Sequence, residues 1–407
     1  MENIEKVYVI QPRLDENCRV LHEEAVALIE SAGAEYCGTT YQTIKKINPA
    51  TYLGSGKLAH IRELLSGLDD ITILFNGSLS PSQTLNISAA LDDRKVIDRT
   101  TLILDIFASR ATTSEGKIQV ELAQLKYLYP RLKGKGSALS RLGGGIGSRG
   151  PGETQLETDR RHIRTRIDYL EERLKETETR RELQLKRREK QNIKTIALVG
   201  YTNTGKSTLM NRLTGAGVLE KDALFATLDP TARKVIIRGK EFLLVDTVGF
   251  LQDLPHDLVE AFKSTLESAL NCDLALIVCD ATGDYDMQFR TTMQTLNSLG
   301  FDSPYIKVLN KSENLEDTTP FADFVCISAK YGNGLDALED EISRKFSDRF
   351  ADCTLVIPYS EISSYSQLTS FVTEKSRKFD ENGLCVDCTI EKIYLPRFIN
   401  FIKKESE

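Results

Sequence analysis

The sequence predicts an α/β protein that is built around a P-loop nucleotide-binding domain. Residues Gly200–Ser207 read G-x-x-x-x-G-K-S and lie between the apolar run 196–199 and an apparent helix. This strand–loop–helix order is typical of a phosphate-binding loop. Short apolar runs alternate with helix-like segments over residues 1–110, as they do in α/β units. Two charged segments, 115–132 and 153–190, carry apolar residues at helical spacing.

The first predicted domain spans residues 1–112 and has an N-terminal α/β organisation. Its apolar runs predict strands, and the amphipathic runs between them predict helices. The expected strands are Val7–Ile10, Ala34–Cys37 and Ile71–Phe75, and the expected helices are His22–Ala32, Leu58–Ser66 and Pro81–Leu91. The run Gly54–Lys57 lacks the spacing of a phosphate loop, so we interpret it as a turn before a helix. A polar or basic surface for RNA at this turn is the alternative.

Residues 113–192 predict a helical coiled-coil hairpin. Two sets of apolar residues recur at heptad-type spacings, and most positions between them are charged. The first set is Ile118, Leu122, Leu125, Tyr129 and Leu132, and the second is Leu156, Ile163, Ile167, Leu170 and Leu174. The pattern indicates two helices that pack antiparallel along their apolar stripes. Two ordinary amphipathic helices that pack on a core are the alternative.

The segment 133–152, between the two predicted helices, is rich in glycine and positively charged. Its basic residues are Lys133, Lys135, Arg141 and Arg149, and the segment contains no acidic residue. Glycine at this density cannot build a packed core and keeps the backbone mobile. A cationic loop on a rigid stalk suits binding to RNA phosphates, with ordering on contact. A solvated linker is the alternative.

The P-loop is the predicted phosphate site. Its glycines let backbone N–H groups turn toward a phosphate, and the positive end of the following helix favours the same negative charge. Lys206 supplies a full positive charge, and the Ser207 hydroxyl is a predicted Mg²⁺ ligand. The expected nucleotide-binding residues are Gly200, Tyr201, Thr202, Asn203, Thr204, Gly205, Lys206, Ser207 and Thr208.

A second predicted nucleotide-binding segment is an apolar run that ends in an acid. Residues 241–246 predict a strand that ends at Asp246, and Thr247, Val248 and Gly249 follow it. The Asp246 carboxylate can hold Mg²⁺ through water, and the N–H of Gly249 can reach the γ-phosphate and move when that phosphate leaves. An ordinary turn at this place is the alternative.

A third segment lies between the P-loop and Asp246. A threonine hydroxyl here would complete the Mg²⁺ shell only in the triphosphate state, and in this way a loop senses hydrolysis. We therefore expect Thr227 to be a Mg²⁺ ligand and a catalytic residue, together with Lys206 and Gly249. The expected nucleotide-binding residues of this segment are Phe225, Ala226, Thr227, Leu228 and Asp229.

Two segments predict a pocket for the guanine base. The strand-like run 305–309 is followed by Asn310, Lys311, Ser312 and Glu313, and an Asn-Lys-x-acid order after a strand is the guanine-reading pattern. Glutamate replaces the expected aspartate and reaches one methylene further, so looser affinity or selectivity is possible, although adenine still lacks the matching edge. The second segment is Ser328, Ala329 and Lys330, which backs the pocket.

In this order, the five segments resemble a small Ras-like GTPase domain over residues 193–347. Phe250 stands where Ras-type proteins carry a water-orienting glutamine, and a phenyl ring cannot hold the attacking water, so we expect slow intrinsic hydrolysis. Asn203 resembles the P-loop asparagine with which some GTPases hold K⁺ against the phosphates, where the ion acts electrostatically. K⁺ is therefore a candidate second cofactor beside Mg²⁺. A loop residue that tolerates unusual φ and ψ is the alternative.

The composition sets outer bounds on function. A chain of 407 residues suits two or three domains, and a net charge of −6 gives no overall nucleic-acid signature. We find no apolar run of the roughly 18 residues that span a membrane and no signal-peptide core. Eight scattered cysteines suit reduced thiols in a cytosol. We expect a cytoplasmic protein, with peripheral membrane association left open.

The chain resembles one family more closely than it resembles Ras-like GTPases in general. This resemblance covers most of the chain up to about residue 345. The run 144–161, GGIGSRGPGETQLETDRR, is similar to the signature of the HflX family of ribosome-associated GTPases. The same holds, in family order, for the segments Leu79–Gln83, Val96–Thr100, Ile118–Leu125, Gly200–Ser207 and Phe225–Pro230. The resemblance implies an N-terminal α/β domain, a helical hairpin, a Ras-like GTPase domain, and a small C-terminal α/β domain over residues 351–407.

The family resemblance also implies a function. It indicates a factor that binds the large ribosomal subunit, directs its glycine-rich loop toward the peptidyl-transferase region, and helps to split stalled or hibernating ribosomes in the GTP state. Hydrolysis of GTP to GDP would release it. Lys133, Lys135, Arg141 and Arg149 would then bind rRNA. We expect the protein to be monomeric away from the ribosome.

Two functions of other classes stay open at this point. An ATP-driven RNA remodeller would use the N-terminal domain and would hydrolyse ATP even after Lys206→Ala. A protein-binding signalling GTPase would bind its partner through the hairpin, and this binding would resist high salt, which weakens phosphate contacts.

Overall fold

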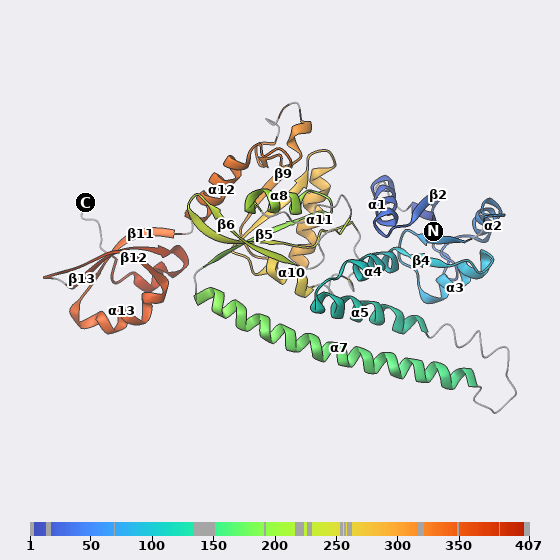
Figure 1. Cartoon of the computed structure of the whole chain (residues 1–407), viewed down its shortest axis with the longest axis horizontal. Helices are drawn as coiled ribbons and strands as arrows, with labels where there is room; N and C mark the ends of the chain where they lie inside the picture. Colours follow the sequence, from blue (N-terminus) through green and yellow to red (C-terminus); the bar gives the residue numbers. More distant parts are fainter. Residues whose placement is uncertain are drawn as a thin grey trace. The chain divides into compact units, whose positions relative to one another are not determined.

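The structure is a computed structural model that describes residues 4–13, 18–68, 70–132, 151–190, 193–215, 224–225, 230–252, 255, 258, 263–315, 317, 321–347, 350–381 and 383–402. The chain divides into two compact units (Figure 1). The first unit comprises Met1–Ile236 with Glu241–Gly332, and the second comprises Ile237–Lys240 with Asn333–Glu407. The domain boundaries expected near residues 112, 192 and 347 remain predictions.

The N-terminal part of the first unit is a four-stranded parallel sheet in the order β2-β1-β3-β4. Its strands are β1 (Lys6–Arg13), β2 (Glu35–Thr43), β3 (Ile71–Phe75) and β4 (Val96–Asp98). Its helices are α1 (Cys18–Ser31), α2 (Ser55–Leu64), α3 (Pro81–Ala90) and α4 (Arg99–Arg110). The predicted α/β organisation is confirmed, with β4 and α4 as additional elements.

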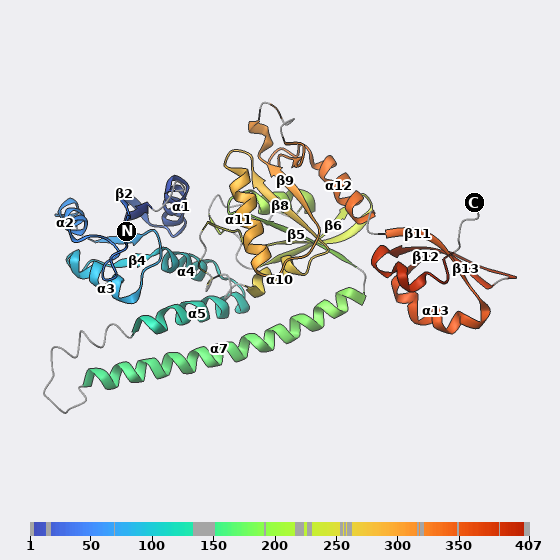
Figure 2. The same ribbon diagram turned by 180° about the vertical axis from the view of Figure 1, so that it is seen from behind.

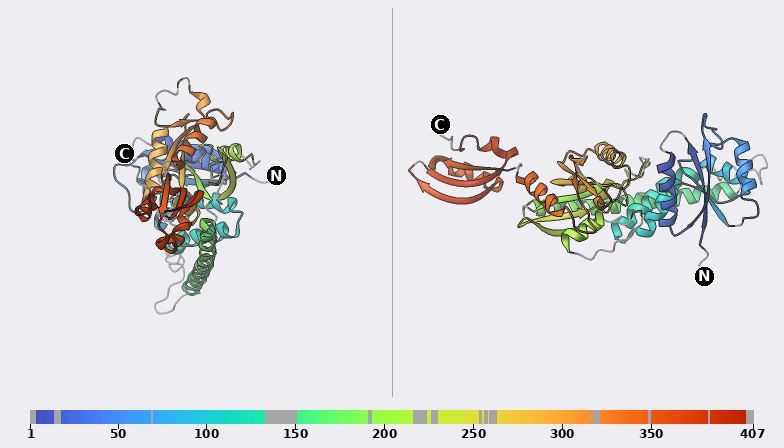
Figure 3. Two further views of the ribbon diagram at one scale, coloured as in Figure 1. Left: turned by 90° about the vertical axis from the view of Figure 1, so that its left-hand side faces the viewer. Right: turned by 90° about the horizontal axis from the view of Figure 1, so that it is seen from above.

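Helices cover both faces of this sheet (Figure 3). On one face Ile73 and Phe75 of β3 pack with Ile61 of α2 and Ile87 of α3. On the other face Leu74 joins a cluster that includes residues of α1 and α4. A strand that is buried on both sides reads as an apolar run, and for this reason β3 was predictable from the sequence.

Three helix starts in this domain follow directly from the sequence. Ser80 and Gln83 form a reciprocal capping box at the start of α3, and Pro81 occupies the first turn. Gly54 is the N-cap of α2, and Ser55–Lys57 form the first turn of this helix, so the helix begins three residues before the expected Leu58. Asp98 ends β4 and caps α4 by accepting a hydrogen bond from the Thr101 N–H at 3.0 Å.

The helical hairpin consists of α5 (Ser114–Leu128), a short 3₁₀ turn (Tyr129–Leu132) and the long helix α7 (Pro151–Lys190). Helices α5 and α7 run in opposite directions in Figures 1 and 2. Arg166 of α7 donates two hydrogen bonds to the Glu121 carboxylate of α5, at 2.7 and 2.9 Å. The predicted hairpin is confirmed. The alternative also holds in part, because Val120 and Ala123 of α5 pack on the N-terminal core.

The second sheet has six strands in the order β10-β9-β8-β5-β7-β6. The strands are β5 (Lys194–Gly200), β6 (Thr231–Ile237), β7 (Lys240–Asp246), β8 (Leu274–Asp280), β9 (Tyr305–Asn310) and β10 (Val325–Cys326). The helices of this part are α8 (Lys206–Thr214), α10 (Lys263–Leu270) and α11 (Tyr285–Ser298). Strands β5, β7, β8, β9 and β10 pair in parallel. Their carboxyl ends therefore lie along one edge of the sheet.

The second unit contains α12 (Leu335–Ser347) and an antiparallel sheet in the order β11-β13-β12. Its strands are β11 (Phe350–Ile357), β12 (Val372–Asp380) and β13 (Gly383–Glu391), and its short helix is α13 (Ile362–Leu368). Leu355, Tyr365, Val386 and Phe398 are among its buried residues. The small C-terminal α/β domain is thus confirmed. Within the described residues of the chain, no helix is long and apolar enough to cross a membrane.

Candidate nucleotide-binding site

Two glycines shape the P-loop, because a side chain at either position would collide with a neighbouring strand. Strand β5 ends at Gly200, and α8 begins at Lys206. A Cβ at Gly200 would lie 2.2 Å from the carbonyl oxygen of Val278 in β8. Gly205 has a φ of 86°, and its Cβ would lie 2.3 Å from Nδ2 of Asn310. The backbone therefore turns into α8 without a side chain at either of these positions, and the N-terminal end of a helix favours a phosphate.

Lys206 is the buried cation of the site. Its Nζ donates hydrogen bonds to the carbonyl oxygens of Tyr201 at 2.6 Å and Gly200 at 3.1 Å. Burial lowers the pKa of the Lys206 ammonium to about 8, while the nearby Asp246 carboxylate opposes this shift. A buried cation with mostly neutral partners favours an anionic ligand. The geometry suits binding of a phosphate group at this point.

Ser207 and Asp246 form the second chemical pair of the site. The Ser207 hydroxyl donates a hydrogen bond to Asp246 Oδ2 at 2.7 Å. Asp246 is buried at the carboxyl end of β7, and Thr247 beside it donates to the Leu198 carbonyl at 2.7 Å. A hydroxyl and a carboxylate are oxygen ligands of the kind that Mg²⁺ takes. The two predicted metal-site residues are thus brought together.

The segment after β7 lies directly against the P-loop. The Thr202 N–H donates to the Phe250 carbonyl at 2.8 Å, and the Phe250 N–H donates to the Gly200 carbonyl at 3.1 Å. A Cβ at Gly249 would lie 2.8 Å from the Thr202 Cα and 3.1 Å from Lys206 Nζ. Glycine at position 249 therefore lets the backbone lie beside the residues that are expected to bind phosphate.

Phe250 itself faces away from the site. Its side chain is 1% exposed and packs in a cluster with Ala197 of β5 and Leu266 of α10. The ring therefore lies in the core and offers no polar atom to an attacking water. This agrees with the expectation that position 250 does not orient the nucleophile.

Asn310 connects the P-loop to the predicted base pocket. Its Nδ2 donates to the Thr204 carbonyl at 2.8 Å, and its Oδ1 accepts from the Ala329 N–H at 2.9 Å. Ser328 is buried beside it and accepts from the Tyr331 N–H at 3.2 Å. The Asn-Lys segment and the Ser-Ala-Lys segment therefore meet at the carboxyl edge of the sheet.

Lys311 also connects the P-loop to the predicted base pocket. Its ion-pair partner, Asp280, was not predicted from the sequence. Lys311 Nζ donates to the Asn203 carbonyl at 3.0 Å and to Asp280 Oδ2 at 2.6 Å. Asp280 ends β8, which pairs in parallel with β9. An acid at the carboxyl end of this neighbouring strand could have predicted a partner for Lys311. Asn203 has a φ of 59° and an exposed side chain, as the loop alternative requires. Glu313 is exposed in a short 3₁₀ helix.

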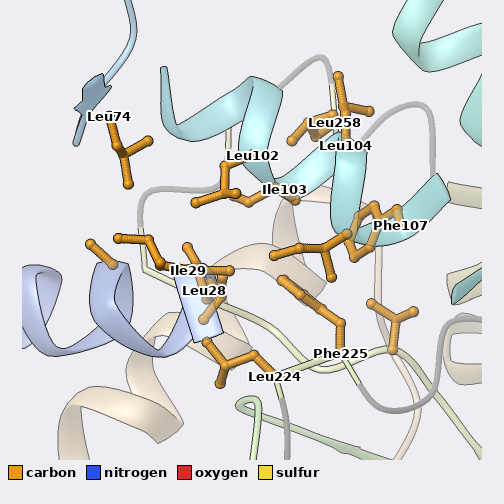
Figure 4. Close-up of a cluster of buried hydrophobic side chains, with 14 of the residues drawn as sticks. Leu28, Ile29, Leu74, Leu102, Ile103, Leu104, Phe107, Leu224, Phe225 and Leu258 are labelled. Atoms are coloured by element: carbon orange, nitrogen blue, oxygen red, sulfur yellow. The ribbon is translucent and has the colours of Figure 1, made fainter. Parts of the chain in front are cut away.

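Several predicted residues lie outside the described part of the chain. These are Lys133, Lys135, Arg141, Arg149, Ala226, Thr227, Leu228 and Asp229. Phe225 is described, and its ring packs edge-on against Phe107 of α4, with 4.5 Å between the ring centroids. The side chain of Phe225 therefore contacts the N-terminal domain (Figure 4), and its role in nucleotide binding stays a prediction.

Three family models match consecutive parts of the chain. Residues 21–108 match the GTP-binding GTPase N-terminal model, residues 110–188 match the GTP-binding GTPase Middle Region, and residues 195–311 match the 50S ribosome-binding GTPase model. The boundaries between these matches fall near the ends of α4 and α7. The order agrees with the N-terminal domain, hairpin and P-loop domain of the structure.

Relatives match over most of the chain. The GTPase HflX of Caldanaerobacter subterraneus subsp. tengcongensis is 46% identical over 399 residues, which cover 97% of this chain and 92% of the relative. The GTPase HflX of Escherichia coli (strain K12) is 41% identical over 375 residues, covering 89% and 87%. A crystal structure of SsGBP in complex with GDP matches with a TM-score of 0.50 and 26% identity, covering 84% of this chain and 98% of that one.

The site geometry and these comparisons agree. The P-loop, the Ser207–Asp246 pair and the Asn310 contacts form the arrangement that a guanine nucleotide-binding domain needs. The relatives span the N-terminal domain and the hairpin as well as the P-loop domain. The chain therefore belongs to the GTPase HflX family, and it binds and hydrolyses GTP.

Proposed function

We propose that this GTPase binds the large ribosomal subunit and uses GTP to split or recycle stalled or hibernating ribosomes in the cytoplasm. The observation that carries the proposal is the antiparallel pair α5 and α7, which the glycine-rich cationic segment 133–150 joins. The match of residues 195–311 to the 50S ribosome-binding GTPase model supports the same partner. The hairpin would bring the cationic segment to rRNA while the P-loop domain controls the lifetime of the complex.

The expected rRNA ligands are Lys133, Lys135, Arg141 and Arg149. Each contact between a cation and a phosphate releases condensed counterions, so binding through these residues weakens as salt rises. The glycine content lets the segment adapt to an irregular RNA surface and order on contact. A protein partner would instead require an apolar contact surface, and the sequence of this segment contains few apolar residues.

The test is ribosome-stimulated GTP hydrolysis by the double variant Arg141→Glu/Arg149→Glu. We expect stimulation by large subunits to be lost while the affinity for GDP is retained, because the charge reversal lies far from the P-loop in sequence. The matched control is Arg62→Glu/Arg290→Glu, which reverses two exposed arginines on α2 and α11. Stimulation that survives in the loop variant would refute the role of the segment.

We propose that Mg²⁺ acts with the nucleotide and is held by Ser207 and Thr227, with Asp246 contacting it through water. The 2.7 Å contact between Ser207 and Asp246 supports two of these roles, and Thr227 lies outside the described residues. When bound there, the ion would supply positive charge beside the phosphates and so favour the charge that develops during phosphoryl transfer. In this proposal Lys206 contributes a second positive charge from the P-loop, and the Gly249 N–H would follow the γ-phosphate.

Phe250 is buried in the core and cannot position the attacking water, so another group must act at this step. We propose that Asn203 helps to hold K⁺ beside the phosphates, where a monovalent cation supplies positive charge in the transition state. Hydrolysis in K⁺ should then exceed hydrolysis in Na⁺ at equal ionic strength. Equal rates in the two salts, or an Asn203→Ala variant that keeps the K⁺ preference, would refute this role.

For the base, we propose that Asn310, Lys311 and Glu313 read guanine and that Ser328–Lys330 back the pocket. The hydrogen bonds from Asn310 to Thr204 and from Ala329 to Asn310 support this arrangement. Competition between GDP and ADP for the site measures selectivity. We expect Glu313→Asp to bind GDP at least as tightly as the parent, because the shorter acid is the usual partner of the base edge. Equal affinity of the parent for ADP and GDP would contradict guanine reading.

A further inference from the structure

The hydroxyl of Thr202 is a buried polar group without a protein partner. Thr202 lies in the P-loop and is 6% exposed, and its Oγ1 has no hydrogen-bond partner among the described residues of the chain. Such a hydroxyl lowers the stability of a protein, because it has lost its water and gained no hydrogen bond in return. Valine has nearly the same shape without the hydroxyl, so packing alone would favour valine here. The hydroxyl therefore indicates a role toward a ligand.

The neighbouring hydroxyls of the site do have protein partners. The Thr204 hydroxyl donates to a P-loop carbonyl at 3.1 Å, and the Thr247 hydroxyl donates to a carbonyl of β5 at 2.7 Å. The Ser207 hydroxyl donates to the Asp246 carboxylate at 2.7 Å. These three groups stabilise the loop, the end of β7 and the predicted metal site. The Thr202 hydroxyl makes no comparable contact and is thus available to a nucleotide.

The Thr202 side chain lies beside the expected position of the γ-phosphate. A Cβ at Gly249 would lie 2.8 Å from both Cα and Cγ2 of Thr202, and 3.1 Å from Lys206 Nζ. The Thr202 N–H also donates to the Phe250 carbonyl at 2.8 Å, which fixes the backbone of Thr202 against this segment. Because Oγ1 and Cγ2 are bonded to the same Cβ, the hydroxyl lies in the immediate surroundings of Gly249 and Lys206.

Hydrolysis needs a group that orients the attacking water, and the Phe250 ring cannot be this group because it is 1% exposed in the core. In the reaction, the water oxygen forms a bond to the γ-phosphorus. The bond between this phosphorus and the β–γ bridging oxygen breaks, its electron pair stays on GDP, and a proton of the water passes to the released phosphate. A threonine hydroxyl can accept a hydrogen bond from the water and donate one to a phosphate oxygen. It can therefore hold both reactants and keep its own proton.

We propose that Thr202 is a catalytic residue of GTP hydrolysis and that its hydroxyl holds the attacking water against the γ-phosphate. Lys206 Nζ lies so close to Gly249 that a phosphate bound to Lys206 displaces the Gly249 segment and takes its place beside Thr202. The hydroxyl then gains the hydrogen bonds that the protein does not supply. Its contribution is orientation of the water, while Lys206 contributes charge. The inference rests on the GTPase activity alone, and neither a ribosomal partner nor K⁺ is needed for it.

The test is single-turnover GTP hydrolysis by the full chain without ribosomes, beside an equilibrium titration with GDP. Thr202→Val removes the hydroxyl and keeps the shape of the side chain, and Thr202→Ser keeps the hydroxyl. We expect the rate constant to fall at least tenfold in Thr202→Val, because the water is no longer oriented, and to stay within threefold of the parent in Thr202→Ser. Affinity for GDP should stay within twofold in both variants, since GDP has no γ-phosphate.

The matched control is Thr292→Val. Thr292 is another buried threonine whose Oγ1 has no partner among the described residues, and it lies on α11. Its replacement should leave the rate and the affinity for GDP within twofold of the parent values. A smaller fall than tenfold in Thr202→Val overturns the proposal, and so does an equal fall in Thr202→Ser. A loss of GDP affinity as large as the loss of rate would assign the hydroxyl to nucleotide binding and also overturn it.

A second readout separates this role from a structural one. Because the Thr202 hydroxyl has no partner in the described protein, the urea midpoint of the nucleotide-free Thr202→Val variant should equal or exceed that of the parent. The same holds for Thr292→Val. A lower midpoint in Thr202→Val alone would show that the hydroxyl stabilises the P-loop, and this result overturns the proposal. If Thr202→Val fails to fold, Thr202→Ala, which also lacks the hydroxyl, decides the comparison of rates.

Discussion

Replacement of Gly205 by alanine tests whether the P-loop and the base pocket act as one structure. Gly205 has a φ of 86°, and its Cβ would lie 2.3 Å from Asn310 Nδ2. The methyl group would therefore displace the amide that holds the Thr204 carbonyl at 2.8 Å and accepts from the Ala329 N–H at 2.9 Å. One substitution at the phosphate site should thus disturb the guanine site.

The magnitude follows from two terms. A left-handed conformation costs an L-residue about 1–2 kcal/mol, and each of the two lost hydrogen bonds contributes about 0.5–1.5 kcal/mol. The sum for Gly205→Ala is about 2–5 kcal/mol in the free energy of unfolding. The matched control is Gly215→Ala, at which φ is 64° and no heavy atom lies within 4 Å of the Cβ. The control should show only the cost of the left-handed conformation, about 1–2 kcal/mol.

The assay combines urea unfolding without nucleotide and titration with a fluorescent GDP analogue. We expect Gly205→Ala to bind GDP about 10 to 100 times more weakly than the control, since each 1.4 kcal/mol is tenfold. Gly215→Ala should retain the parent affinity. If the two variants bind GDP equally well, the steric link between Gly205 and Asn310 has no role in binding, and the reasoning fails.

Three further predictions concern charged groups. Burial lowers the pKa of Lys206 to about 8, from an ordinary value of 10.5. Between pH 8 and pH 10.5 the unfolded chain therefore binds more protons than the folded chain, and the stability of the nucleotide-free protein should rise with pH. Affinity for GDP should fall above pH 8, because the phosphates favour the charged amine. Asp280→Asn should weaken GDP binding several-fold by freeing Lys311. Arg166→Glu should destabilise the hairpin by about 0.2–1 kcal/mol, and adding Glu121→Arg should restore it.

Each of these predictions has its own measurement. Calorimetry at pH 8.5 in buffers of different ionisation heat should report proton uptake on GDP binding, and heats that do not depend on the buffer would contradict the Lys206 assignment. For Asp280, the control is Asp286→Asn on the exposed side of α11, which should keep the parent affinity. For the hairpin, a double-mutant cycle in thermal unfolding with no coupling would show that the ion pair contributes nothing.

The parts of the fold that were predictable are those whose signals are local in sequence. The P-loop, the Asp246 strand end and the Asn310 motif each lie within a few residues of an apolar strand, so pattern alone identified them. β4 has only three residues, too few for a periodic signal. β2 extends to Thr43 through polar threonines and a glutamine, because an edge strand of a sheet need not be apolar.

The contacts that were not predictable join residues far apart in the chain. Arg99 donates to the main-chain carbonyl of Gln252 across 153 positions, and nothing around either residue marks the other. Asp280 gave a weaker signal, since its position beside Lys311 depends on the parallel register of β8 and β9. Sequence patterns therefore predicted the nucleotide-binding segments, whereas the contacts between these segments and the N-terminal domain were visible only in the tertiary structure.

Helix α7 has a mechanical consequence. It contains 40 residues, which at 1.5 Å per residue is about 60 Å of continuous helix. Its last residue, Lys190, lies only four positions before Lys194, the start of the central strand that leads to the P-loop. If the helix stays rigid, a tilt of about 5° displaces its far end by about 5 Å over this length. A small tilt at the Lys190 end of α7 is therefore a movement of several ångströms at its Pro151 end.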